Sequence, residues 1–277
     1  MGPIDTVAPV APFHDGFCHE RPDPSSPAVI LLHGVTGGPA EMGRLAKALY
    51  SGGFSTYVPR LAGHGSIEEL RVTPLQAWLE ASEQMVAEVA ASAPRRLYLA
   101  GLSFGSLLSL YLLSSAPESF GGAALFSVPF CFRSRREQLL LTALSRLPEQ
   151  TLNRFGTIPK RTRAEGIFLE VRESFPMHSL AAAARLFKLR RRIIAKLPLI
   201  SCPVLIIQDP EDHHLDAGGA LFLQRRLRGA RTSLRWYPGA EHEVTIGRRR
   251  DEIISATMKF FMDLEIEVTR EPLCPAR

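Results

Sequence analysis

Ser103 is the residue in this sequence whose surroundings most strongly indicate a nucleophile. It lies in Gly101-Leu-Ser-Phe-Gly105, a match to G-x-S-x-G, between a segment over 96–101 typical of a strand and one over 104–114 typical of a helix. A serine on so sharp a strand-to-helix turn presents its hydroxyl at the end of the strand, and flanking glycines remove clashes that larger side chains would make. This context favours a nucleophile over a serine in an ordinary turn.

His242 is the predicted general base. It ends the segment Trp236-Tyr-Pro-Gly-Ala-Glu-His242, between a predicted strand over 232–236 and a predicted helix over 249–264. Loops that follow parallel strands gather at the carboxyl edge of the sheet, where ligands bind in open α/β sheets. In hydrolases with this elbow the chain order is serine, acid, histidine, so the base comes late. His33 is instead expected to shape its own loop.

The acid that orients His242 is expected after the predicted strand over 203–208. Spacing alone does not choose among the four carboxylates there, which are Asp209, Glu211, Asp212 and Asp216. The adjacent pair His213-His214 could suggest a metal, but no third ligand stands at a usual spacing. We therefore expect neither a metal nor a cofactor.

A glycine-rich segment, His33-Gly-Val-Thr-Gly-Gly-Pro39, follows the apolar run over 28–32. Acyl transfer needs N–H donors at the place where negative charge develops on the carbonyl oxygen. The expected donors are the backbone amides of Val35 and Phe104. The helix that begins at Phe104 also directs its free N–H groups and the positive end of its dipole toward that charge.

The order of predicted elements indicates an α/β fold with a mostly parallel central sheet and helices on both faces, because strand and helix segments alternate along the chain. The proline-rich tail, residues 1–26, is expected to hold at most a short edge strand. Residues 27–128 and 199–270 form the predicted core. Residues 129–198 contain helical segments without clear strands, and we interpret them as a small helical cap insertion.

The insertion also carries most of the positive charge. The 277-residue chain has a net charge of +5, whereas residues 132–197 hold 15 Lys and Arg against 5 Asp and Glu. Such a surface could simply be solvated, or it could attract an acidic carrier protein or an anionic membrane surface. No nucleic-acid-binding motif accompanies it, so no nucleic-acid partner is expected.

The hydrophobic and cysteine patterns of the chain indicate where in the cell it is expected to be found. No apolar run reaches the roughly 18 residues of a membrane span, and the N-terminus has no pattern of a secretory signal. The four cysteines stand far apart in the sequence, which favours free thiols and a cytoplasmic location.

Five segments, in the same order along the chain, resemble the bacterial carboxylesterases and monoacylglycerol lipases of the α/β-hydrolase superfamily. They are VILLHGVTGGPAEM, PRLAGHG, LAGLSFGS, PVLIIQDPEDHHLD and WYPGAEHEVT. The resemblance implies a catalytic triad of Ser103, His242 and Asp212, with Val35 and Phe104 as oxyanion donors. Two residues depart from the family pattern: Asp209 stands where a small residue is common, and Val35 replaces an aromatic residue.

The predicted function is hydrolysis of a carboxylic ester with an apolar acyl group, a small-molecule substrate, through an acyl-enzyme. One alternative is a thioesterase or acyltransferase acting on an acyl chain bound to an acyl carrier protein, which the basic insertion would attract. Another is an aminopeptidase of the same fold, for which the sequence shows no acidic group to hold the substrate's amine. A non-enzymatic ligand-binding protein is a further alternative.

Overall fold

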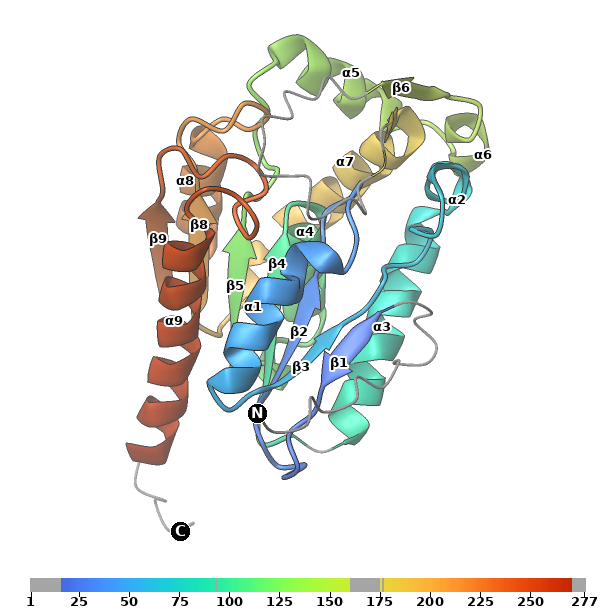
Figure 1. Ribbon diagram of the computed structural model, residues 1–277. Coiled ribbons are helices and arrows are strands. Elements are labelled where there is room, and N and C mark those ends of the chain that lie inside the picture. Colours follow the sequence, from blue (N-terminus) through green and yellow to red (C-terminus); the bar gives the residue numbers. More distant parts are fainter. Residues whose placement is uncertain (1–15, 93, 160–174, 176, 271–277) are drawn as a thin grey trace.

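The central sheet has seven strands in the order β1-β3-β2-β4-β5-β8-β9 (Figure 1). The structure is a computed structural model that describes residues 16–92, 94–159, 175 and 177–270. Each neighbouring pair in this sheet is parallel except β1–β3, which is antiparallel. The predicted mostly parallel sheet is therefore confirmed. The strands are β1 (Phe17–His19), β2 (Ala28–Leu32), β3 (Ser55–Val58), β4 (Leu97–Leu102), β5 (Gly122–Phe126), β8 (Val204–Gln208) and β9 (Thr232–Trp236).

Helices cover both faces of the sheet because its inner strands are apolar on both sides. All residues of β2 are buried, and its side chains alternate between two core clusters, as the period of a strand requires. Val29 and Leu31 pack with α1 (Ala40–Ser51) and α9 (Arg250–Arg270). Ile30 and Leu32 belong to the opposite cluster, which includes side chains of α3 (Leu75–Ala91), α4 (Phe104–Ser115) and α8 (Gly218–Arg226).

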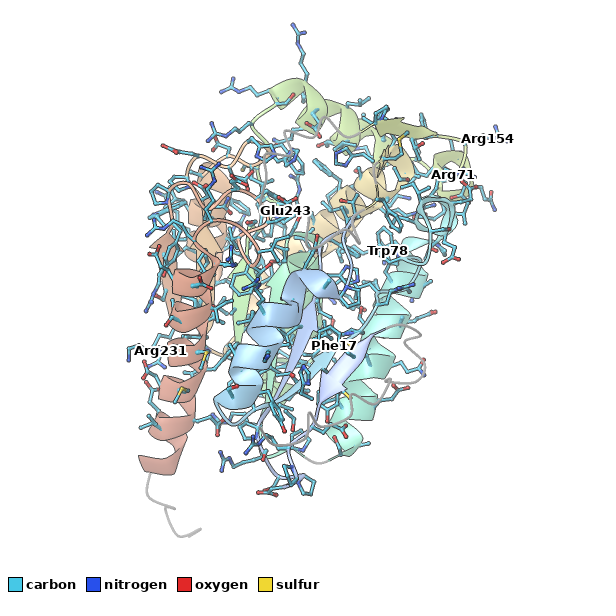
Figure 2. All side chains as sticks on the ribbon, viewed as in Figure 1. Phe17, Arg71, Trp78, Arg154, Arg231 and Glu243 are labelled. Carbon is cyan, nitrogen blue, oxygen red and sulfur yellow. The ribbon has the colours of Figure 1, made fainter. Side chains whose placement is uncertain are left out.

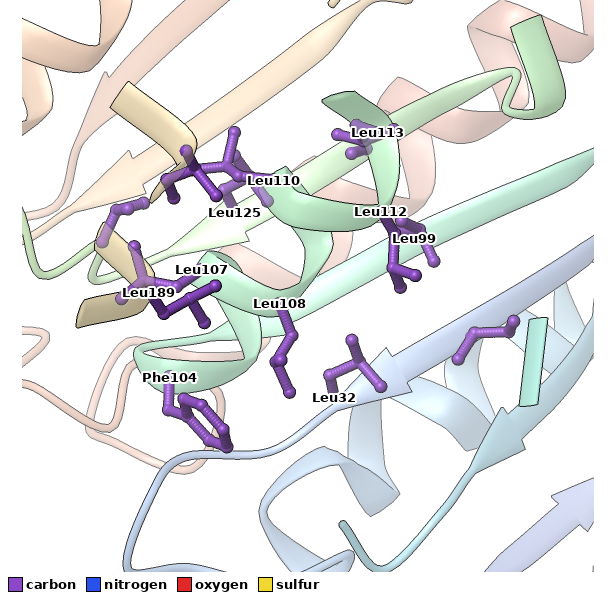
Figure 3. Close-up of a cluster of buried hydrophobic side chains, with 14 of the residues drawn as sticks. Leu32, Leu99, Phe104, Leu107, Leu108, Leu110, Leu112, Leu113, Leu125 and Leu189 are labelled. Carbon is purple, nitrogen blue, oxygen red and sulfur yellow. The ribbon is translucent and has the colours of Figure 1, made fainter. Parts of the chain in front are cut away.

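The helix α4 is buried along almost its whole length. It is apolar on nearly every side, which is typical of a helix enclosed by other elements. Figure 3 shows its leucines in one buried cluster with Leu99 of β4, Leu125 of β5 and Leu189. Leu189 belongs to α7 (Leu180–Ile194). The helix that follows Ser103 thus packs against both the sheet and α7.

The predicted insertion contains more than helices. Its elements are α5 (Arg135–Leu144), α6 (Glu149–Leu152), β6 (Thr157–Pro159), β7 (Met177–Ser179), α7 and the 3-10 helix η3 (Leu197–Leu199). The expectation of no strands was wrong, because β6 and β7 form an antiparallel pair. Strands of three residues are too short to show an alternating pattern. The boundaries of the insertion stay a prediction.

A buried arginine ties the insertion to the rest of the fold. The side chain of Arg185 on α7 is fully buried, and its guanidinium donates to the Glu149 carboxylate at 2.7 Å. It also donates to the Asn153 side chain and, at 2.6 Å, to the carbonyl of Arg71. Arg71 lies on α2 (Ile67–Val72), near Arg154 at the end of the molecule where the insertion meets α2 (Figure 2).

The C-cap residue of the short helix α2 is Thr73, whose hydroxyl donates to the Glu69 carbonyl at 2.7 Å. The following helix, α3, begins at Leu75. Within the described ranges, no helix combines the length and the hydropathy that crossing a bilayer requires.

The packing of α7 depends on a large buried aromatic ring. Phe187 is fully buried, and its ring lies 5.1 Å from that of Phe132. We expect Phe187→Ala to lower the free energy of unfolding by about 3–5 kcal/mol, because a large buried ring is lost and a cavity remains. Leu139→Ala on α5, where the side chain is 71% exposed, is the matched control and should change it by less than about 0.5 kcal/mol. Equal urea midpoints for the two variants would contradict this account of α7.

Candidate active site

Ser103 occupies a strained turn between β4 and α4. Its backbone has φ 52° and ψ −108°, in the left-handed half of the map that non-glycine residues rarely adopt. A Cβ at Gly101 would lie 2.4 Å from the carbonyl oxygen of Gly105, and one at Gly105 would lie 2.1 Å from that of Leu32. Both glycines are therefore required by close backbone contacts. The amide of Ser103 donates to the Phe126 carbonyl at 2.8 Å, which ties the turn to β5.

Three side chains predicted to act together lie in one hydrogen-bonded row. The Ser103 Oγ is 3.1 Å from His242 Nε2, and His242 Nδ1 is 2.7 Å from the Oδ2 atom of Asp212. Because Asp212 is an acceptor, the network places a proton on Nδ1 and leaves Nε2 free to accept the serine hydroxyl. The three residues follow β4, β8 and β9, so the parallel sheet brings them to one edge.

The structure distinguishes the candidate acids. Asp212 is fully buried, and its Oδ1 accepts the amides of His214 at 2.7 Å and Leu215 at 3.0 Å, while Oδ2 faces His242. Asp209 holds the backbone instead, because it accepts the amide of Glu241 at 2.7 Å. The remaining carboxylates are not in the row: Glu211 donates its own amide to Asp209, and Asp216 accepts from Gly218.

Burial and charge act in opposite directions on His242. Burial alone lowers the pKa of its imidazole, but the Asp212 carboxylate, through its charge and its hydrogen bond, raises that pKa above the usual range. Glu243 and Glu41 add to the increase through their charges (Glu243 is labelled in Figure 2). Burial raises the pKa of Asp212, and the charge of His242 together with three N–H donors lowers it overall. The pair therefore favours an ionised Asp212 and a stabilised imidazolium.

Ser127 is a residue of the site that sequence analysis missed. It is buried at the end of β5 with φ 48°, and its hydroxyl donates to the carbonyl oxygen of His242 at 2.7 Å. This bond fixes the backbone that carries the imidazole. The available signal was its place directly after the strand next to β4, and that alone does not separate it from other serines.

The loop after β2 is held by two histidines. His33 Nε2 accepts the amide of Leu61 at 3.1 Å, and its Nδ1 lies 2.9 Å from the carbonyl of Gly34. His64 Nε2 lies 3.0 Å from the carbonyl of Val35. Burial, with the nearby His64, lowers the pKa of His33 well below its usual value, so this ring stays neutral. These contacts are those of a residue that shapes the loop.

Val35 and Phe104, the expected oxyanion donors, flank the nucleophile. Phe104 directly follows Ser103 as the first residue of α4, and its ring packs 4.7 Å from that of Trp78. Val35 lies in the loop after β2, where a Cβ added to the preceding Gly34 would be 4.0 Å from the Ser103 Cβ. Their role as donors stays a prediction.

Histidines near the site do not form a candidate metal centre. The rings of His213 and His214 are 4.0 Å apart, and His214 lies 5.2 Å from His242. Among the side chains that the structure describes, no three His, Cys, Asp or Glu residues are grouped so that they could hold a metal ion. His214 is instead kept neutral, because burial and the charge of His242 lower its pKa to about 3.

Comparison with known proteins identifies the family of this chain. The model of the family described as serine aminopeptidase, S33, a family of α/β hydrolases, matches residues 23–248. The chain belongs to this S33 family. It is 28% identical over 237 residues to a thermostable monoacylglycerol lipase of Bacillus sp. (strain H-257), across 84% of this chain and 89% of the relative. It is 24% identical to a carboxylesterase of Bacillus subtilis (strain 168), across 86% and 93%.

Solved structures share the fold of this S33 hydrolase. The structure reported with the metagenome-derived lipolytic enzymes LipS and LipT has a TM-score of 0.74 and 24% identity, covering 86% of this chain and 94% of its own. The α/β-hydrolase fold expected from the sequence is thus confirmed, and the likeness to named lipases and esterases supports an ester hydrolase.

The two aspartates permit a matched test. We expect Asp212→Asn to lower kcat about 10⁴-fold, because the amide no longer stabilises the imidazolium or selects the useful tautomer. Asp209→Asn keeps one oxygen for the Glu241 amide and loses only the acceptor of the Glu211 amide, so it should cause a far smaller loss. Steady-state kinetics with p-nitrophenyl butyrate would compare them. The assignment of Asp212 is wrong if the two variants lose equal activity or if Asp209→Asn loses more.

The raised pKa of His242 predicts the pH dependence. General-base catalysis needs the neutral imidazole, so kcat/KM should rise with pH. Because Asp212 holds the imidazole pKa above the ordinary 6.5, the half-maximum should lie above pH 6.5. A profile of kcat/KM from pH 5 to 10 measures it. A half-maximum at or below pH 6.5 would contradict the electrostatics described for the row.

Proposed function

We propose that this S33 hydrolase cleaves carboxylic esters that carry an apolar acyl group, through an acyl-enzyme on Ser103. The observation that carries the proposal is the row of hydrogen bonds from Ser103 through His242 to Asp212, at 3.1 and 2.7 Å. A hydroxyl, an imidazole and a buried carboxylate in this order are the parts that nucleophilic acyl transfer needs.

The first half-reaction forms the acyl-enzyme. His242 Nε2 takes the proton of the Ser103 hydroxyl as Oγ attacks the ester carbonyl. The negative charge that develops on the carbonyl oxygen is stabilised by the amides of Val35 and Phe104, each contributing about 3 kcal/mol. When the tetrahedral intermediate collapses, the C–O bond breaks, and His242 gives its proton to the leaving alcohol.

The second half-reaction consumes water. His242 Nε2 accepts a proton from water as its oxygen attacks the acyl carbon, and the proton then returns to Ser103 Oγ. The products are a carboxylic acid and an alcohol, and the enzyme regains its starting state. Asp212 keeps the imidazole oriented in both halves through its bond to Nδ1. No step requires a cofactor.

Similarity to named lipases supports an apolar acyl group, because a monoacylglycerol lipase is 28% identical to this chain over 237 residues. The gap beside Phe104, between α3 and α4, is filled by buried side chains such as Trp78, Met85 and Leu108 and leaves no space for a water molecule. An acyl chain gains from leaving water, whereas a charged or sugar-like group would lose hydrogen bonds.

Peptide substrates with a free N-terminus are less well supported, despite the family's name. An aminopeptidase needs an anionic side chain to hold the substrate's ammonium group. Three carboxylates near the row already accept N–H groups of the protein: Asp212 from His242, Asp209 from Glu241, and Glu41 from Gly34. Ester hydrolysis uses the same site without such a group.

A lipid surface fits the insertion better than an acidic carrier protein. Several basic side chains are used inside the protein: Arg185 is buried with Glu149, and Arg190 donates to the carbonyl of Phe130 at 2.7 Å. On α5, Leu139 and Leu140 are 71% and 52% exposed. Neighbouring apolar and basic side chains suit an anionic lipid interface, which would present ester substrates with long acyl chains.

The experiment compares wild-type protein with Ser103→Ala on p-nitrophenyl esters from acetate to palmitate. We expect turnover by the wild type, and a loss of at least about 10³-fold in the variant, because no other group can form the acyl-enzyme. An acyl-thioester and an alanine p-nitroanilide serve as competing substrates. Faster turnover of either one would replace ester hydrolysis as the principal activity, and equal activity of Ser103→Ala would exclude Ser103 as nucleophile.

A further inference from the structure

A buried carboxylate lies beside the nucleophile without a part in the chemistry described above. Glu41 belongs to the first turn of α1, and only 7% of it is exposed. Its Oε2 accepts the amide of Gly34 at 2.9 Å. A buried carboxylate is costly unless strong hydrogen bonds compensate it, so its retention at this place calls for a specific role.

The loop after β2 is built around this carboxylate. A Cβ added to Gly37 would lie 1.9 Å from Oε1 and 2.2 Å from Oε2 of Glu41, so only glycine leaves room for it. A Cβ added to Gly34 would lie 3.2 Å from Oε2 and 4.0 Å from the Cβ of Ser103. Glu41 thus fills the inside of the turn, and the turn lies directly against the nucleophile.

We propose that Glu41 is a positioning residue for acyl transfer: by holding the Gly34 amide, it directs the adjacent Val35 amide toward the oxyanion. This rests on the proposed function, in which Val35 is an oxyanion donor. The two planar peptide units that carry the Gly34 N–H and the Val35 N–H meet at the Gly34 Cα. Glu41 holds the first unit, and the second is held through the Gly34 carbonyl, which accepts the Gly37 amide at 3.2 Å and lies 2.9 Å from His33 Nδ1. With both units held, the Val35 N–H has a fixed direction. The other fixed points of the loop, at His33 and His64, hold carbonyl groups. Glu41 supplies the complementary hold on an N–H.

A charged acceptor suits this place better than a neutral one. Hydrogen bonds to a carboxylate are about twice as strong as neutral ones, and the N-terminal end of α1 favours negative charge. The charge also reaches the base. His242 faces Asp212, Glu243, Glu41 and His214, and the Glu41 charge is one of those that raise its pKa. Glu41 therefore affects both the donor loop and the base, and the two effects can be separated by substitution.

The first test compares Glu41→Ala with Glu41→Gln on the preferred p-nitrophenyl ester. We expect Glu41→Ala to lower kcat about 10–100-fold with KM nearly unchanged, because a misdirected oxyanion donor affects the transition state more than substrate binding. Glu41→Gln keeps an acceptor for the Gly34 amide and should restore most of kcat. It should also move the half-maximum of kcat/KM to lower pH, since one negative charge near His242 is lost.

The second test uses the glycine that makes room for the carboxylate. Gly37→Ala should displace Glu41 and reproduce the loss of kcat, and it should add little when combined with Glu41→Ala. The control is Glu69→Ala. Glu69, in the first turn of α2, also has its carboxylate close to a glycine, since a Cβ added to Gly65 would lie 2.6 Å from Glu69 Oε2. Unlike Glu41, Glu69 is exposed. We expect the control to leave kcat unchanged.

The outcomes separate this inference from the proposed function. Normal kcat in Glu41→Ala, or a KM effect alone, overturns the positioning role while leaving ester hydrolysis intact. Additive losses in the Gly37→Ala, Glu41→Ala pair also overturn it, because the two sites would then act independently. Absence of wild-type turnover, or full activity of Ser103→Ala, instead removes the proposed function on which the inference rests. Circular dichroism of each variant identifies a loss of activity that comes from unfolding.

Discussion

The strained turn at Ser103 is the constraint on which the site depends. A non-glycine residue at φ 52° costs about 1–3 kcal/mol and persists only where its surroundings hold it. Here the surroundings are hydrogen bonds and close packing. Ser106 Oγ lies 2.6 Å from the Gly101 carbonyl and 2.9 Å from that of Phe126, and Gly105 brings α4 against β2. The buried helix α4 and the two adjacent strands therefore serve to keep one hydroxyl in an unfavourable backbone position.

The same kind of strain recurs around the imidazole. Among the residues that the structure describes, three non-glycine residues have positive φ: Ser103, Ser127 and Glu241. Ser127 donates to the carbonyl of His242, and the Glu241 amide, next to His242, is held by Asp209. Strain is thus confined to the nucleophile and to the two contacts that fix the base. Asp209 is thus buried near the site because it holds the Glu241 amide, and it does not belong to the row.

Sequence predicted most of the fold because its signals are local. The apolar runs of β2, β4, β5 and β8, and the glycines beside Ser103, need only neighbouring residues to be recognised. It could not choose among the four carboxylates after β8 by spacing, since the decision depends on which oxygen a turn aims at Nδ1, and the resemblance alone indicated Asp212. Ser127 meets its partner 115 residues away, and Glu41 looks like an ordinary solvent-facing residue at the start of a helix.

The effect of each carboxylate on catalysis depends on its position relative to His242 and to the oxyanion. Negative groups near His242 stabilise the imidazolium of the transition state, yet the same groups would oppose an oxyanion. Asp212 avoids this conflict by contacting Nδ1, on the side of the ring away from Ser103. Glu41 lies closer to the loop that carries the donors, and its charge is bound by the Gly34 amide. A carboxylate in that position can order the N–H groups of the loop, provided that its own oxygens stay turned toward them and away from the substrate.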